Sequence, residues 1–292
     1  AEVARAGGER QRARAMYRQV ADQNTTTAWR VRALQELADM ATEDNEPERG
    51  VTLWRELLTS LPPSHPAAPD ARLSLVAALM GNNNIEEALR VCRQAVDAAP
   101  NPADVRTSRV ACAEVEERDG RWTEASNTYS AVLNDTDTPI EVMVDAALGA
   151  ARTALASSAP EEANRAIGIG LARAEDPVHR LPLLAMRIQA LRALDAGTDL
   201  RAAIFERDNL AEQAPEIAWL AFLESAGQAR SRGDADMASE LLGRALNLPI
   251  ATEQRARVLV ELGGALLDMG QVDAAADRFE QVLKLADDDP IL

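Results

Sequence analysis

One spacing of residues recurs along this chain and limits what it can fold into. The stretch 257–290 has the pattern of two amphipathic helices joined by a tight turn at Gly270, because glycine ends a helix by taking positive φ without steric cost. Ala275, Phe279 and Val282 then follow at helical spacing. They supply a small residue for close approach, a bulky residue to fill the space beyond, and an apolar residue on the same face. Neither helix could bury its apolar face alone, so the unit needs copies beside it.

The copies are present from one end of the chain to the other. The residues at the turn position are Gly8, Asn45, Asn83, Gly120, Ser158, Gly197, Gly233 and Gly270. Successive turn positions are 36 to 39 residues apart. The copy at Gly197 is the poorest, since the polar Glu206 and Asn209 occupy its bulky and apolar positions. This regularity predicts an all-α solenoid of antiparallel helix pairs.

The array resembles the tetratricopeptide repeat (TPR) family. The strings that carry the resemblance are NNIEEALRVCRQAVDAAP at 83–100, GRWTEASNTYSAV at 120–132 and GQVDAAADRFEQV at 270–282. Family units end on a proline, and Pro62, Pro100 and Pro215 hold that place here. The resemblance implies a right-handed superhelix. Two features depart from the family: the period exceeds its usual value of about 34 residues, and the first-helix pattern is degenerate.

The repeat spacing predicts one solenoid domain over residues 1–292. Only seven residues precede Gly8, whereas a first helix needs about fifteen. The first repeat is therefore expected to be truncated, and the chain to be a fragment of a longer bacterial protein. Its compartment, cytoplasmic or periplasmic, stays open.

Charge and hydropathy exclude two classes of partner. The formal net charge is −16, which repels the phosphate backbone of nucleic acids, and no basic patch interleaved with aromatic residues appears. No run of about 18 apolar residues occurs, so no segment is expected to insert into a membrane. The partner that remains is a protein or peptide.

The chain offers few residues for chemistry. His65 and His179 lie beside prolines in predicted linkers, without acidic or cysteine neighbours at metal-ligand spacing. No glycine-rich phosphate loop follows a strand. We therefore expect no metal, no cofactor and no catalysis. Cys92 and Cys112 fall on apolar helix positions and are expected to be small buried side chains; a disulfide between adjacent helices, or a redox role, stays open.

The resemblance also implies a binding surface. In the family, first helices line the concave face through residues three, six, ten and thirteen before the turn. Here such positions supply four arginines and several leucines, among them Arg152, Arg187, Arg230, Arg257, Leu148, Leu155 and Leu191. A groove of this kind would suit a peptide that carries acidic groups. The alternative is that the arginines pair with acidic residues of the chain and the leucines pack between repeats.

These observations favour a non-catalytic scaffold that binds a protein or peptide. The alternative is a sensor or regulatory part of a larger enzyme, such as a kinase, NTPase or glycosyltransferase, whose catalytic part lies outside this chain. Self-association through the end repeats is a further expectation.

Overall fold

The computed structural model describes residues 10–23, 27–62, 65–231 and 233–288, and within these ranges it has fifteen helices and no strand. The first helices of successive pairs are α3 (Thr27–Glu43), α5 (Ala68–Gly81), α7 (Pro102–Arg118), α9 (Ile140–Ala156), α11 (Pro177–Ala193), α13 (Pro215–Ser231) and α15 (Thr252–Asp268). The second helices are α2 (Arg10–Asp22), α4 (Pro47–Ser60), α6 (Ile85–Asp97), α8 (Trp122–Leu133), α10 (Pro160–Arg173), α12 (Gly197–Gln213), α14 (Ala235–Leu246) and α16 (Val272–Asp288). The predicted all-α repeat fold is confirmed.

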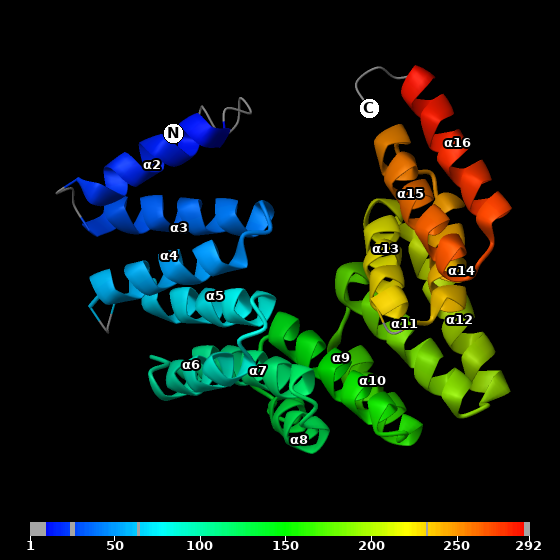
Figure 1. Ribbon diagram of the computed structural model, residues 1–292. Coiled ribbons are helices and arrows are strands. Elements are labelled where there is room, and N and C mark those ends of the chain that lie inside the picture. The colour runs from blue at the N-terminus through cyan, green and yellow to red at the C-terminus, as the bar shows by residue number, and fades with distance from the viewer. Residues whose placement is uncertain (1–9, 24–26, 63–64, 232, 289–292) are drawn as a thin grey trace. The chain divides into compact units, whose positions relative to one another are not determined.

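The helices belong to two compact units. Unit 1 comprises residues 1–153 and unit 2 residues 154–292, with the boundary inside α9. In unit 1 each helix from α2 to α8 packs on the next one along the chain, and in unit 2 the same holds from α10 to α16 (Figure 1). The single domain over 1–292 stays a prediction. The predicted truncated repeat before Gly8 lies outside the described residues.

The same turn joins the two helices of each described pair. Its central residue has positive φ at Asn45, Asn83, Gly120, Ser158, Asp195, Gly233 and Gly270. In each turn the N–H of this residue donates to the carbonyl three residues earlier. The following N–H donates to the carbonyl five residues earlier, and all these bonds span 2.8–3.1 Å. This is a Schellman motif, which satisfies the last carbonyls of the first helix.

One predicted turn residue was wrong by two positions. Asp195 has positive φ (52°), whereas Gly197 is the first residue of α12. Aspartate tolerates this left-handed conformation because its short polar side chain can hydrogen-bond locally. With Asp195 at the turn, successive turn residues are separated alternately by 38 and 37 residues. The repeat is therefore more regular than the sequence alone indicated.

The second helices pack through the predicted small residue. The buried residues at this position are Gly50, Ala88, Ala125, Ala163, Ala238 and Ala275. Two of the bulky residues four positions later lie directly on helix backbone. A Cβ atom built on Gly149 would be 2.3 Å from Cζ of Tyr129, and one on Gly263 would be 2.5 Å from Cε1 of Phe279. No larger residue fits at these two glycines without displacing the ring.

The pair α11/α12 departs from this packing. Counted from Asp195, its small, bulky and apolar positions hold Leu200, Ile204 and Arg207. Leu200 and Ile204 are only partly buried, whereas Arg207 is 1% exposed. α11 buries residues on every side instead: Leu181, Leu183, Leu184, Ala185, Met186, Ile188, Ala190 and Leu191. The first helix therefore supplies the apolar burial that the second lacks.

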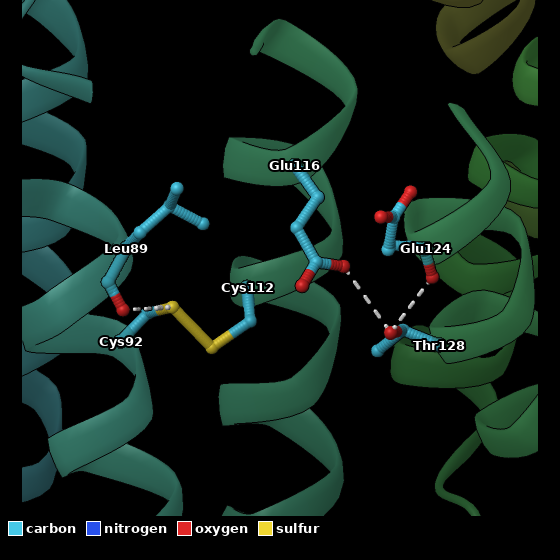
Figure 2. The surroundings of a disulfide bond; sticks show 6 residues. All are labelled: Leu89, Cys92, Cys112, Glu116, Glu124 and Thr128. Carbon is cyan, nitrogen blue, oxygen red and sulfur yellow. Dashed lines mark hydrogen bonds between the residues drawn. A yellow bond between two sulfur atoms is a disulfide. The ribbon is translucent and has the colours of Figure 1, made fainter. Parts of the chain in front are cut away.

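A disulfide joins α6 to α7 in unit 1. Figure 2 shows the bond between Cys92 and Cys112, whose Cα atoms are 5.3 Å apart. Both side chains are buried, as predicted. Their expected role as separate apolar side chains was wrong, because the helices face each other at this point and bring the two sulfur atoms within bonding reach. The disulfide left open by the sequence is the arrangement observed.

Candidate functional site

The turn geometry defines a candidate binding surface in each unit. We call it the first-helix face: the residues three, six, ten and thirteen positions before each turn residue. In unit 1 its exposed members include Asp39 and Thr42 of α3, Ala77 of α5 and Glu114 of α7. Because each first helix ends in the same Schellman motif, these positions recur in register along the unit.

With Asp195 as the turn residue, the first-helix face of α11 consists of other residues than the sequence predicted. Arg192 and Gln189 now stand three and six residues before the turn. The predicted Arg187 and Leu191 fall between the face positions. Leu191 is 1% exposed and packs in a cluster with Ile188 and Ala203. Leu191 thus belongs to the core between α11 and α12, and its prediction as a surface contact was wrong.

A pocket of about 520 Å³ lies in unit 1. Its lining residues come from three helices and one turn: Asp39, Thr42, Glu43, Asn45, Glu46, Pro47, Gly50, Trp54, Ser74, Ala77, Ala78 and Gly81. Three of them, Asp39, Thr42 and Ala77, belong to the first-helix face. The pocket therefore opens on the face where the sequence predicts a ligand, although none of the predicted peptide contacts lines it.

Carboxylates dominate the polar part of this pocket. Glu43 accepts a hydrogen bond from Arg10 at 2.9 Å, and Glu46 accepts one from Arg49 at 3.1 Å. Burial tends to raise the pKa of Glu46, but the hydrogen bond from Arg49 and the charge of Arg14 outweigh it and hold that pKa below its ordinary value. Glu46 is thus ionised at neutral pH.

The predicted Arg152 of α9 belongs to a polar network in unit 1. Its Nε and Nη2 donate to the two carboxylate oxygens of Glu117 at 2.9 and 3.0 Å, and the Tyr129 hydroxyl donates to the same carboxylate at 3.0 Å. Desolvation raises the pKa of Tyr129 and, against the pull of Arg152, that of Glu114. For Arg152, desolvation is outweighed by Glu117, which raises the arginine pKa. An internal partner thus holds this arginine.

Arg230 of α13 is held in a similar way in unit 2. It contacts Glu261 at 3.0 Å and Asp268 at 2.8 Å. Its guanidinium lies over Gly264, where a Cβ atom would be 2.9 Å from both terminal nitrogens. An acidic ligand would have to displace two of the protein's own carboxylates to reach Arg230. The predicted ligand with acidic groups stays a prediction.

The remaining predicted contacts differ in exposure. Arg257 is exposed near the start of α15, and Leu148 and Leu155 of α9 are partly exposed. Arg187 is partly buried, and its Nε has no hydrogen-bond partner among the described residues. Leu148 and Arg152 belong to unit 1 and the other predicted contacts to unit 2. A peptide site formed by these residues stays a prediction.

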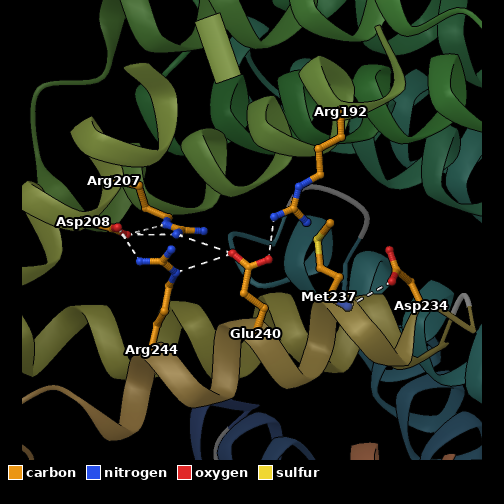
Figure 3. Close-up of polar contacts among 7 residues, drawn as sticks. All are labelled: Arg192, Arg207, Asp208, Asp234, Met237, Glu240 and Arg244. Carbon is orange, nitrogen blue, oxygen red and sulfur yellow. Dashed lines mark hydrogen bonds and ion pairs between the residues drawn. The ribbon is translucent and has the colours of Figure 1, made fainter. Parts of the chain in front are cut away.

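Arg207 forms the centre of a second charged cluster, shown in Figure 3. Its Nε and Nη2 donate to Asp208 at 3.0 and 2.9 Å. Asp208 also pairs with Arg244, and Glu240 pairs with Arg192 at 2.5 Å. Desolvation lowers the pKa of Arg207. The cluster joins α11, α12 and α14 around a charge that stands at an apolar position of the repeat.

The described residues contain no group of His, Cys, Asp and Glu side chains that could hold a metal ion. Nδ1 of His65 accepts the N–H of Ala67 at 3.1 Å and thereby closes a turn before α5. Among the helices described, none is both long and apolar enough to cross a membrane. The expectation that the chain is not an enzyme stays a prediction.

Most of the pocket was not predicted from the sequence. Glu43 and Glu46 lie at and after the end of α3, and Trp54 lies on α4. The family pattern pointed only to first-helix positions, whereas the pocket also uses the turn and the second helix. The one available signal was the acidic run from Glu43 to Glu46, directly before a helix rich in apolar residues.

Known proteins share this architecture at low sequence identity. A family model described as tetratricopeptide repeat matches residues 258–291. The apo form of the quorum sensor NprR from B. thuringiensis is 11% identical, with a TM-score of 0.57 over 93% of this chain and 80% of its own. The apo form of RapI is 6% identical, with a TM-score of 0.53 over 88% of this chain and 97% of its own.

A protein of Podosopora anserina with nearly identical TPR-like repeats is 17% identical to this chain. Its TM-score is 0.53 over 64% of this chain and 97% of its own. Curated proteins offer no match to the sequence. At such identities the similar structures establish the fold alone.

Proposed function

We propose that this chain, which has a tetratricopeptide-like repeat fold and matches a tetratricopeptide repeat model over residues 258–291, is a non-catalytic scaffold that binds a segment of another protein through the first-helix face of unit 1. The observation that carries the proposal is the pocket on that face. Its volume of about 520 Å³ falls in the range of about 300–1,000 Å³ typical of ligand sites. Small residues of α5 meet acidic residues of α3 there, so the pocket offers both space and polar groups to a side chain of the bound segment.

The surroundings of the pocket support this proposal. Trp29 of α3 is 64% exposed. It stands fourteen residues, close to four helical turns, before Glu43 of the pocket, so the two residues lie on the same side of the helix. Exposed aromatic residues are frequent anchors in protein interfaces. The pocket and Trp29 together give α3 two features, about 20 Å apart at 1.5 Å per residue, that an extended segment of six or seven residues could span.

A displayed library of random twelve-residue peptides, panned against the chain, tests the proposal. We expect peptides to be enriched on the parent protein and lost on the Ala77→Leu variant, whose larger side chain fills the pocket from an exposed position. Ala131→Leu serves as the matched control, because Ala131 is an exposed residue of the second helix α8, outside both the pocket and the first-helix face. Enrichment that Ala77→Leu leaves unchanged, or no enrichment at all, would refute the proposal.

A sensory or regulatory role within a larger protein is the second candidate. The observation that favours it is the fold shared with the quorum sensor NprR over 93% of this chain. The parent reading frame distinguishes the two: a catalytic domain in the same polypeptide would support the regulatory role. Self-association stays a prediction that light scattering at high protein concentration can check.

A further inference from the structure

We infer that the pocket of unit 1 receives a basic side chain, lysine or arginine, of the bound protein segment. This inference rests on the proposed function and adds the chemistry of the ligand. It draws on two independent features of the pocket: the small residues that keep it open, and the sign of its charged groups.

The small residues keep the space open next to an apolar surface. A Cβ atom on Gly50 would lie 3.7 Å from that of Ala78, and one on Gly81 would lie 3.6 Å from that of Pro47. These ordinary contact distances show that α4 and α5 approach closely where they meet, and Trp54 is the one large side chain from these two helices among the lining residues. The methylene stem of a lysine or arginine buries well against such an apolar surface.

The charged groups select the ligand. Asp39, Glu43 and Glu46 are all acidic, and the twelve lining residues include no lysine, arginine or histidine. The surface from α5, which includes Ser74 and Ala77, adds no charge. An anionic side chain would meet three carboxylates without a basic partner in the pocket. A cation would meet acceptors and an attractive field.

The chain already pairs these carboxylates with arginines. Arg10 of α2 contacts Glu43, and Arg14 of α2 contacts Glu46 at 3.4 Å; Asp39 also has a polar interaction within the chain. A carboxylate offers about four acceptor sites, so neither the contact of Glu43 with Arg10 nor the contacts of Glu46 with Arg14 and Arg49 fill all of them. Glu43 and Glu46 are 44% and 40% exposed, which leaves part of each group accessible to a second guanidinium or ammonium.

Backbone and indole NMR shifts of the ¹⁵N-labelled full chain test this inference. The probes are three capped pentapeptides of alanine with arginine, glutamate or leucine at the centre, compared at one ionic strength. We expect the arginine peptide alone to shift the Gly50 and Gly81 amides and the Trp54 indole. Its affinity should fall about tenfold in the Asp39→Asn/Glu46→Gln double variant, because each removed charge weakens a charge-assisted hydrogen bond.

Two controls keep the result interpretable. Glu124→Gln removes one exposed carboxylate of α8, outside both the pocket and the first-helix face, and should leave the affinity within about twofold. The far-ultraviolet circular dichroism of the double variant should match the parent, so that a loss of binding does not reflect unfolding. The double variant keeps the size of both side chains and changes only their charge.

Three outcomes would overturn the inference. Equal shifts with the glutamate or leucine peptide would show that the pocket does not select for positive charge. An unchanged affinity in the double variant would show that Asp39 and Glu46 do not bind the ligand. No shift with any probe would show that the pocket is not a binding site. These results are distinct from failure of the proposed function. Library peptides enriched through the pocket but without basic residues would leave the scaffold in place and refute only the inference.

Discussion

The pairs α7/α8 and α11/α12 have the same architecture but reach it differently. The first follows the repeat spacing: Ala125, Tyr129 and Val132 of α8 are buried. The second replaces the same positions with Leu200, Ile204 and Arg207, of which only the arginine is fully buried.

Both pairs nevertheless share the Schellman turn and a first helix of 17 residues. The comparison teaches that the turn and the summed burial of both helices specify this repeat, while the residue spacing is one of several ways to supply that burial. α11 shows another way, because it is buried on nearly all sides. The predictions below test this difference, beginning with the largest expected effect.

Exchanging the residue types at the apolar position should have opposite results in the two pairs. Val132→Arg places a charge at a site that is 1% exposed, so we expect a loss of about 3–5 kcal/mol in the free energy of unfolding. Arg207→Met should be neutral or stabilise by about 1 kcal/mol, because Asp208 retains Arg244 and Glu240 retains Arg192. Urea unfolding measures both, and a loss above about 3 kcal/mol for Arg207→Met would show that its buried charge is essential.

The disulfide distinguishes the α7/α8 region further, because it joins α7 to the preceding pair across 20 residues of sequence. Reduction should lower the free energy of unfolding by about 3 kcal/mol, since a loop of this length regains its chain entropy in the unfolded state. Thermal unfolding with and without reductant measures the loss. The Cys92→Ser/Cys112→Ser variant serves as the control and should not respond to reductant; an equal response in that variant would contradict the assignment.

Glycine substitutions sharpen the comparison at smaller cost. Gly149→Ala should destabilise by about 1–3 kcal/mol, because the new methyl group would overlap the Tyr129 ring. Gly168→Ala in α10 is the matched control: it also lies inside a helix, but a Cβ atom there would meet nothing within 4 Å. It should stabilise by about 0.5–1 kcal/mol through helix propensity. Equal effects at both glycines would disprove the close ring contact.

The smallest expected effect concerns Glu114 beside the Tyr129 network. Glu114 is exposed as a residue, but the protein atoms around its carboxyl desolvate that group and raise its pKa. The folded state therefore binds this proton more tightly than the unfolded state, and stability falls as pH rises through the folded pKa. Glu114→Gln should therefore stabilise the protein at pH 7, by less than about 0.5 kcal/mol, and the gain should vanish near pH 3.5. A gain that persists at low pH would point to a cause other than ionisation.

Much of this fold could be predicted from the sequence because its turns have a strong local signature. Gly120, Gly233 and Gly270 mark positions where positive φ is needed, and buried alanines follow at a constant distance. Asp195 was missed because a glycine stood two residues away and aspartate rarely marks a left-handed turn. The disulfide could not be predicted, since its formation depends on the rotation of α6 against α7.

The site was harder to predict than the fold. Face positions can be counted from a turn, so Arg152 and Arg230 were placed on first helices correctly, but their pairing with Glu117 and Glu261 depends on side-chain geometry. The pocket depends on where three helices meet, and its acidic residues at the end of α3 and in the following turn have no repeat signature. The packing of helices that are distant in sequence therefore determines where the first-helix face contains a pocket.

Hydrogen exchange with mass spectrometry, applied to the parent chain with and without its best enriched library peptide, tests the central claim most directly. Peptide binding at the pocket should slow exchange in residues 27–54 and 68–84, which form α3, α5 and the start of α4, and leave unit 2 unchanged. Slowed exchange confined to residues 154–288 would contradict the account, because the ligand would then bind unit 2 rather than the acidic pocket of unit 1.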